Sequence, residues 1–232
     1  MILSIGVSPE SFWVPIVLIF GGLIAAFTAW YGFKAYKLTA NKRYFYFTLA
    51  FILLSLELII FGIVAPTIMA YYRYFHGFNV TYLLYLVHGL NIIFVFSTLM
   101  AYSLFILIYS KLERLSLTLL VTTLILALAG YSYYLAYIGE AYASRLGFNL
   151  VSIMLLSFII LYAARNYLFR RSVNSLLVLI TFILIGLGHV LFVFDRFSNL
   201  LNLYGFIIQL VGYITLFIMF LRINYGQKKK QV

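Results

Sequence analysis

NSLLVLITFILIGLGHVLFVFD, residues 174–195, contains no charged residue before Asp195 at its end. A run of about 20 predominantly apolar residues is long enough to cross the hydrocarbon core of a bilayer as an α-helix. Backbone polar groups in lipid must be hydrogen-bonded within the protein, and a helix meets this requirement by itself. The stretch therefore predicts a membrane-spanning helix.

The rest of the chain has the same character. Of its 232 residues, 66% are hydrophobic and 9% are charged, whereas charged residues make up about a quarter of an ordinary soluble domain. Further apolar stretches lie at about 12–36, 44–72, 81–110, 115–138, 147–168 and 199–222. We therefore predict an all-α fold, a polytopic membrane helix bundle of seven transmembrane helices that forms one domain over residues 1–232.

Basic residues are concentrated in alternate connections between the predicted spans. Of the 16 Lys and Arg residues, all but Arg73, Arg145 and Arg196 lie in the first, third and fifth connections or at the C-terminus. Because cytoplasmic loops carry an excess of Lys and Arg, we predict a multi-pass protein of the plasma membrane with the N-terminus outside and the C-terminus in the cytoplasm. The net charge of +11 then reflects topology, and without a folded basic domain it does not indicate a nucleic-acid partner.

Two parts of the chain resemble each other. Shifting residues 31–61 by 131 positions places Tyr36 on Tyr167 and FILLSLELIIF (51–61) on FILIGLGHVLF (182–192). The same shift superimposes the first two spans on the fifth and sixth with the same orientation. We therefore predict a parallel internal repeat, with units of about 12–110 and 147–222 joined by the fourth span. Parallel repeats of this kind occur in membrane transporters.

Several chemistries are excluded or lack a motif. The chain has no cysteine, so it ligates no iron–sulfur cluster. A retinal Schiff base would need a lysine in the last span, and residues 201–222 contain none. We find no nucleophile elbow, no phosphate-binding glycine loop and no zinc-ligand spacing. The sequence therefore leaves open whether the protein is an enzyme. It has no catalytic motif of its own, and a catalytic role would be that of one subunit of a larger complex, a respiratory oxidoreductase.

Two histidines within the spans are candidate ligands of a haem b. His88 lies in the third span and His189 in the sixth, each about six residues from the predicted outer boundary. At 1.5 Å per residue both imidazoles would lie roughly 9 Å deep, and two histidines at one depth can ligate one iron from both faces. The neighbouring Gly89, Gly186 and Gly188 are small enough for a flat ring to approach the helices.

Arginines support the same hypothesis at the outer edge. Arg73 and Arg196 are predicted where the haem propionates would emerge, and guanidinium groups bind carboxylates well. The chain would then be a b-type cytochrome-like subunit that transfers electrons, to or from a quinone, together with other subunits of a membrane complex. Alternatively, both histidines simply form hydrogen bonds between helices.

Glu57 is the one acidic residue in the middle of a predicted span, and ionisable residues in lipid indicate functional sites by default. It has three interpretations: a relay for protons or ions, a partner for a cation on another subunit, or a protonated carboxyl bonded within the bundle. The first fits a small-molecule or ion transporter with its pathway between the repeats. A non-catalytic accessory or sensory subunit is the third functional class.

Overall fold

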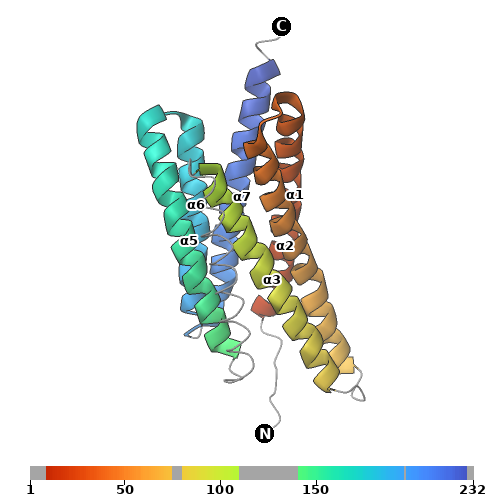
Figure 1. Ribbon diagram of the computed structural model, residues 1–232. Helices are drawn as coiled ribbons and strands as arrows, with labels where there is room; N and C mark the ends of the chain where they lie inside the picture. The colour runs from red at the N-terminus through yellow and green to blue at the C-terminus, as the bar shows by residue number, and fades with distance from the viewer. Residues whose placement is uncertain (1–8, 75–79, 110–140, 196, 229–232) are drawn as a thin grey trace.

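The computed structural model describes residues 9–74, 80–109, 141–195 and 197–228 of the chain (Figure 1). Within these ranges the protein forms six α-helices and no strand. The helices are α1 (Pro9–Thr39), α2 (Lys42–Tyr74), α3 (Val80–Tyr109), α5 (Ala141–Arg170), α6 (Val173–Val193) and α7 (Asn199–Lys228). The predicted fourth span, 115–138, lies outside the described residues, so the prediction of seven spans stays a prediction, while each of the other six predicted spans is an α-helix.

Five of these helices are long and apolar enough to cross a membrane. The apolar segments are Trp13–Thr39, Lys42–Val64, Leu146–Arg170, Val173–Val193 and Leu200–Ile223, and α3 contributes the shorter segment Ile92–Ile108. Large apolar side chains also cover the outer surface, with Phe20 and Phe27 each 58% exposed. Such a surface is unfavourable in water and is matched by lipid. The prediction of an all-helical membrane protein is therefore confirmed.

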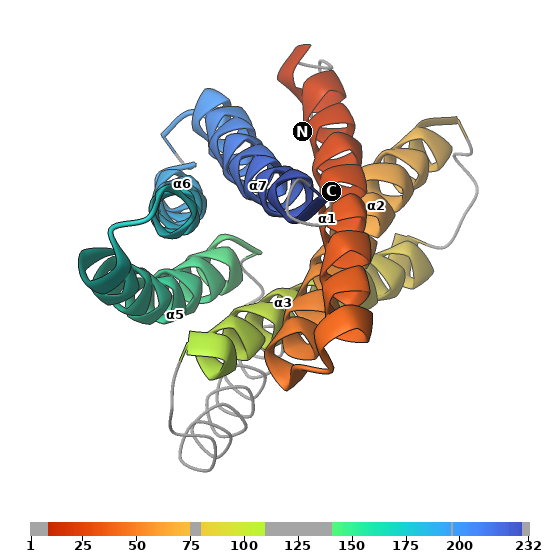
Figure 2. The same ribbon diagram turned by 90° about the horizontal axis from the view of Figure 1, so that it is seen from above.

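The six helices are arranged as a closed ring (Figure 2). Each packs on two neighbours, in the order α1, α2, α3, α5, α6, α7 and back to α1. The interior is filled by side chains from residues spaced three or four apart, which lie on one face of a helix. On α2, for example, Phe47, Phe51, Leu54 and Leu58 are all buried.

The turn between α1 and α2 and the turn between α5 and α6 have the same backbone geometry. Each helix ends before a residue in the left-handed conformation, Ala40 (φ 51°) and Arg171 (φ 46°). The amide of Ala40 donates to the carbonyl of Tyr36 at 2.8 Å, and that of Arg171 donates to Tyr167 at 2.7 Å. A left-handed residue with this bond is a common helix C-terminus. Corresponding positions in the two turns differ by 131.

The start of the following helix is also alike in the two turns. The Asn41 side-chain oxygen accepts from the Arg43 amide at 3.0 Å, and the Ser172 hydroxyl oxygen accepts from the Ser175 amide at 3.2 Å. Both are side-chain caps that satisfy an otherwise free N–H of the first helical turn. The shift of 131 thus relates the helix ends at these two turns and the capping residues Asn41 and Ser172.

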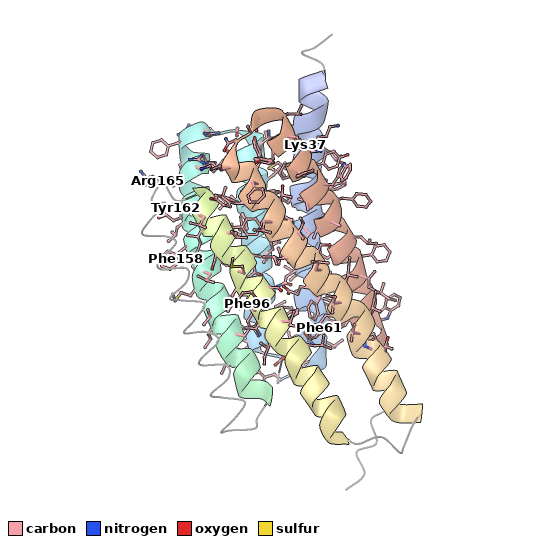
Figure 3. All side chains as sticks on the ribbon, turned by 45° about the vertical axis from the view of Figure 1, so that its right-hand side comes forward. Lys37, Phe61, Phe96, Phe158, Tyr162 and Arg165 are labelled. Carbon is pink, nitrogen blue, oxygen red and sulfur yellow. The ribbon has the colours of Figure 1, made fainter. Side chains whose placement is uncertain are left out.

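Both turns lie at one end of the bundle, and this end is basic. Figure 3 shows Lys37 and Arg165 near it. The exposed Lys and Arg side chains among the described residues are Lys34, Lys37, Lys42, Arg43, Arg165, Arg170, Arg171 and Arg222. We call this end the basic end and the opposite one the far end.

Candidate functional site

Phenylalanines from four helices fill the interior toward the basic end. Ring centroids lie 4.6 Å apart for Phe47 and Phe51, 4.8 Å for Phe47 and Phe220, and 5.2 Å for Phe51 and Phe105. Phe182 contacts Phe105, also at 5.2 Å. All five are buried. We call Phe47, Phe51, Phe105, Phe182 and Phe220 the basic-end layer, because their rings contact one another at this level of the bundle.

A second group of phenylalanines lies toward the far end. Phe61 and Phe94 have centroids 4.6 Å apart, Phe94 and Phe148 are 5.7 Å apart, and Phe192 and Phe206 are 4.7 Å apart. These side chains are half-buried, and Figure 3 shows Phe61 on α2, away from Lys37. We call Phe61, Phe94, Phe148, Phe192 and Phe206 the far-end layer.

Buried polar side chains lie between these two layers. The order along each helix demonstrates this: Glu57 lies between Phe51 and Phe61 on α2, and His189 lies between Phe182 and Phe192 on α6. Ten residues of helix separate each pair of phenylalanines, roughly 15 Å at 1.5 Å per residue. We call the following residues the polar layer: Glu57, Thr98, Tyr102, Asn149, His189, Gln209 and Tyr213. Five helices contribute to it.

His189 uses both of its ring nitrogens within the protein. Its Nε2 is 2.7 Å from the Tyr102 hydroxyl, and its Nδ1 is 2.9 Å from Oδ1 of Asn149. An amide oxygen can only accept, so the hydrogen-bond network assigns the ring proton to Nδ1 and makes Nε2 the acceptor of the Tyr102 hydroxyl proton. His189 therefore joins α3, α5 and α6 as a neutral, fully bonded imidazole.

Glu57 is only half bonded. Its Oε1 is 2.7 Å from the Thr98 hydroxyl, while its Oε2 has no hydrogen-bond partner among the described residues. The side chain is 5% exposed. Tyr102 and Tyr213 are close enough to interact with it electrostatically. A buried oxygen without a partner is costly, so this carboxyl requires an explanation that His189 does not.

A small cavity lies next to the polar layer, between α1, α2 and α7. Gly21, Leu58, Gln209 and Tyr213 line it together with apolar neighbours, and its volume of about 10 Å³ has room for about one water molecule. The Nε2 of Gln209 has no hydrogen-bond partner among the described residues. The cavity is lined mainly by apolar side chains, and Gln209 and Tyr213 are the polar side chains that a water in it could contact.

The surroundings of His189 do not favour a haem. Neither ring nitrogen is left for an iron, and the helix at Gly188 has no clearance for a flat ring. A Cβ at Gly188 would lie 2.8 Å from the Gly205 carbonyl oxygen and against Gln209, whereas a Cβ at Gly89 would meet no atom within 4 Å. Gly188 therefore allows α7 to approach α6 closely.

His189 contacts α3 at Tyr102, which is roughly 21 Å along the helix from His88 at 1.5 Å per residue. The side chains of His88 and Arg73 and the whole of Arg196 lie outside the described residues. Their pairing with His189 around a haem therefore stays a prediction. In the part of the chain that the structure describes, no three His, Asp or Glu residues gather into a metal site.

Sequence reasoning identified Glu57 and His189 but not their partners. The chain contains 21 tyrosines, and nothing in the sequence distinguishes Tyr102 from the others. Thr98 and Tyr102 are four residues apart and so share a helix face, but such pairs are common in an aromatic-rich chain. Tyr102 and Asn149 could be found only from the packing.

No protein-family model, no curated protein and no solved structure matches the chain. The site is therefore interpreted from its own chemistry.

Proposed function

We propose that the protein is an ion transporter of the plasma membrane and that Glu57 binds the transported ion. The observation that carries the proposal is the Oε2 of Glu57, which is buried in the polar layer and has no hydrogen-bond partner among the described residues. A carboxyl that only joins helices gains most when both of its oxygens are bonded. An ionisable group kept buried and half bonded is typical of an ion or proton pathway.

The two phenylalanine layers support this proposal. They flank the polar layer along α2 and α6, and barriers on both sides of a central site are expected of a transporter in an occluded state. Alternating access requires one barrier on each side of a central site. Opening either layer would give Glu57 access to one side of the membrane.

The relation between the two halves also supports transport. The helix ends and caps of the two equivalent turns repeat with a shift of 131. In the ring, the contact of α3 with α5 corresponds to the contact of α7 with α1, as a parallel repeat requires. Transporter sites commonly lie at the interface of such repeats, and here Glu57 of the first half faces Tyr213 of the second.

The proposal assigns direction as well. Under the positive-inside rule the basic end faces the cytoplasm and the N-terminus lies outside. The basic-end layer is then the cytoplasmic barrier, and the far-end layer is the external one.

This function accounts for more of the site than the two alternatives do. An electron carrier with His189 as an iron ligand would have to break the bond to Tyr102 or the bond to Asn149. An accessory subunit gives no reason for the unpartnered oxygen of Glu57. The absorption spectrum of the purified protein distinguishes the first of these, because a bound haem gives a Soret band.

Flux measurements in liposomes test the proposal. The protein is reconstituted with trapped fluorescent indicators for protons, sodium and potassium, and an opposing gradient of each ion is imposed. We expect flux of at least one ion above that of protein-free vesicles, and its loss in Glu57→Gln. The matched control is Asp195→Asn, which replaces a carboxylate outside the polar layer. Absence of flux for all three ions, or equal flux in Glu57→Gln, contradicts the proposal.

A further inference from the structure

We infer that the ion is a proton, and that Glu57 holds it as a neutral carboxylic acid that hydrogen-bonds to Thr98 in the occluded arrangement. This inference rests on the proposed function and names its substrate. It is carried by the hydrogen bonds of Thr98, the oxygens around Glu57 and the cavity beside Gln209.

The Thr98 hydroxyl has two acceptor oxygens within hydrogen-bond distance. The hydroxyl has one hydrogen but lies 2.7 Å from Oε1 of Glu57 and 3.0 Å from the carbonyl oxygen of Phe94. Threonines in these helices regularly donate to the carbonyl four residues earlier, as Thr28 and Thr181 do at 2.8 and 2.9 Å. If Thr98 does the same, the hydrogen in its contact with the carboxyl must come from Glu57.

A neutral Glu57 supplies a hydrogen for each of the two contacts of the Thr98 hydroxyl. Its carboxyl O–H donates to the Thr98 hydroxyl oxygen, and the Thr98 hydroxyl donates to the Phe94 carbonyl. Each hydrogen is then used once, and no negative charge remains in the dry interior, where an unpaired charge would be very costly. The short separation of 2.7 Å is typical of an O–H···O bond.

The oxygens that the structure describes around Glu57 do not provide the ligands that sodium or potassium would need. A metal cation such as sodium or potassium exchanges its hydration shell for several oxygens in a site. Near Glu57 the hydroxyl of Thr98 is already bonded twice, and the hydroxyl of Tyr102 is bonded to His189. The nearby unpartnered group of Gln209 is an N–H donor, which repels a cation. A proton needs only one carboxyl oxygen.

Release of the proton requires a water molecule that can reach the polar layer. The cavity lined by Gln209 and Tyr213 has room for about one water molecule, and Tyr213 interacts electrostatically with Glu57. When a barrier opens, the Glu57 acid gives its proton to a water molecule, which leaves a carboxylate and a hydronium ion. The Thr98 hydroxyl then turns its hydrogen from the Phe94 carbonyl to the carboxylate. Reloading reverses these steps.

The groups that face Glu57 are compatible with such exchange. Tyr102 on α3 and Tyr213 on α7 are the titratable side chains in electrostatic contact with it. On α1, which also packs on α2, the titratable side chains that the structure describes are Tyr31, Lys34, Tyr36 and Lys37, toward the basic end. No basic side chain among these would hold Glu57 permanently as a carboxylate.

Infrared spectroscopy tests the protonation state directly. The spectrum of reconstituted wild-type protein minus that of Glu57→Gln at neutral pH should contain the C=O stretching band of a protonated carboxyl. Thr98→Val should shift this band because the acid loses its acceptor. Thr28→Val and Thr181→Val are matched controls, since they lose the same intrahelical bond elsewhere and should leave the band in place. A carboxylate band in place of the acid band overturns the inference.

Flux measurements separate the two proposals. With sodium and potassium replaced by a large organic cation, we expect an imposed pH gradient still to dissipate through the wild-type protein and not through Glu57→Gln. Glu57-dependent flux of sodium or potassium without proton flux overturns the proton assignment and leaves the transporter proposal in place. Absence of any Glu57-dependent flux overturns the transporter proposal, and the infrared band then still decides whether Glu57 is neutral.

Discussion

The motifs at 51–61 on α2 and 182–192 on α6 are similar in sequence but treat their polar residue in opposite ways. Each begins with a phenylalanine of the basic-end layer and ends with one of the far-end layer. Between them, His189 is bonded at both ring nitrogens, whereas one oxygen of Glu57 has no partner in the part of the chain that the structure describes. A polar residue in a membrane helix is therefore better judged by the bonds it lacks than by its type.

The largest effect should come from the phenylalanines that the two motifs share. Phe51→Ala and Phe182→Ala each leave a large cavity in a fully buried layer, which should lower the free energy of unfolding by about 3–5 kcal/mol. Denaturant unfolding in detergent micelles measures this effect. Phe158→Ala is the control, because Phe158 is 48% exposed on the outer surface of α5 (Figure 3). A large effect at only one of the two sites would break the equivalence of the motifs.

His189→Leu should have the next largest effect. It removes two hydrogen bonds and leaves the Tyr102 hydroxyl and the Asn149 amide buried without partners, at a cost of about 1–3 kcal/mol for each. A double-mutant cycle with Tyr102→Phe should give a favourable coupling energy. Unchanged stability, together with a Soret band lost in both His189→Leu and His88→Leu, would instead restore the haem hypothesis.

Gly188→Ala should destabilise the fold by about 1–3 kcal/mol, because the added methyl group would force α6 and α7 apart. Thermal unfolding measures the loss. Gly89→Ala is the matched control, since a Cβ there meets nothing within 4 Å and alanine favours helix. Equal tolerance at both sites would mean that α6 and α7 are not in the close contact described.

Glu57→Leu should have the smallest effect on stability, but it should abolish ion flux. Exchanging a half-bonded buried carboxyl for an apolar group of similar size should leave the free energy of unfolding within about 1 kcal/mol of wild type. Parallel unfolding and liposome measurements compare the two properties. A loss of stability as large as that of His189→Leu would make Glu57 a structural residue like His189.

The sequence predicted the helices well because lipid imposes a simple rule on them. Long apolar stretches and the shift of 131 located α1, α2, α5, α6 and the equivalent turns. The depth of the histidines was less accessible to sequence. Counting residues from a predicted boundary assumes that spans run parallel, but α3 crosses the bundle obliquely (Figure 1). Tyr102 thus contacts His189, and this pairing depends on helix tilt and rotation, which only tertiary packing determines.

If Glu57 carries a proton as we propose, the phenylalanine layers on its two sides would determine how the protein responds to membrane voltage. A transmembrane potential falls mainly across the parts of a protein that exclude water and ions. One elementary charge crossing a membrane fully gains or loses about 2.3 kcal/mol per 100 mV. With a barrier on each side of Glu57, a proton that reaches it from either surface crosses only part of this field. Loading of Glu57 should therefore depend on voltage, and the dependence from the two sides should add up to one full charge.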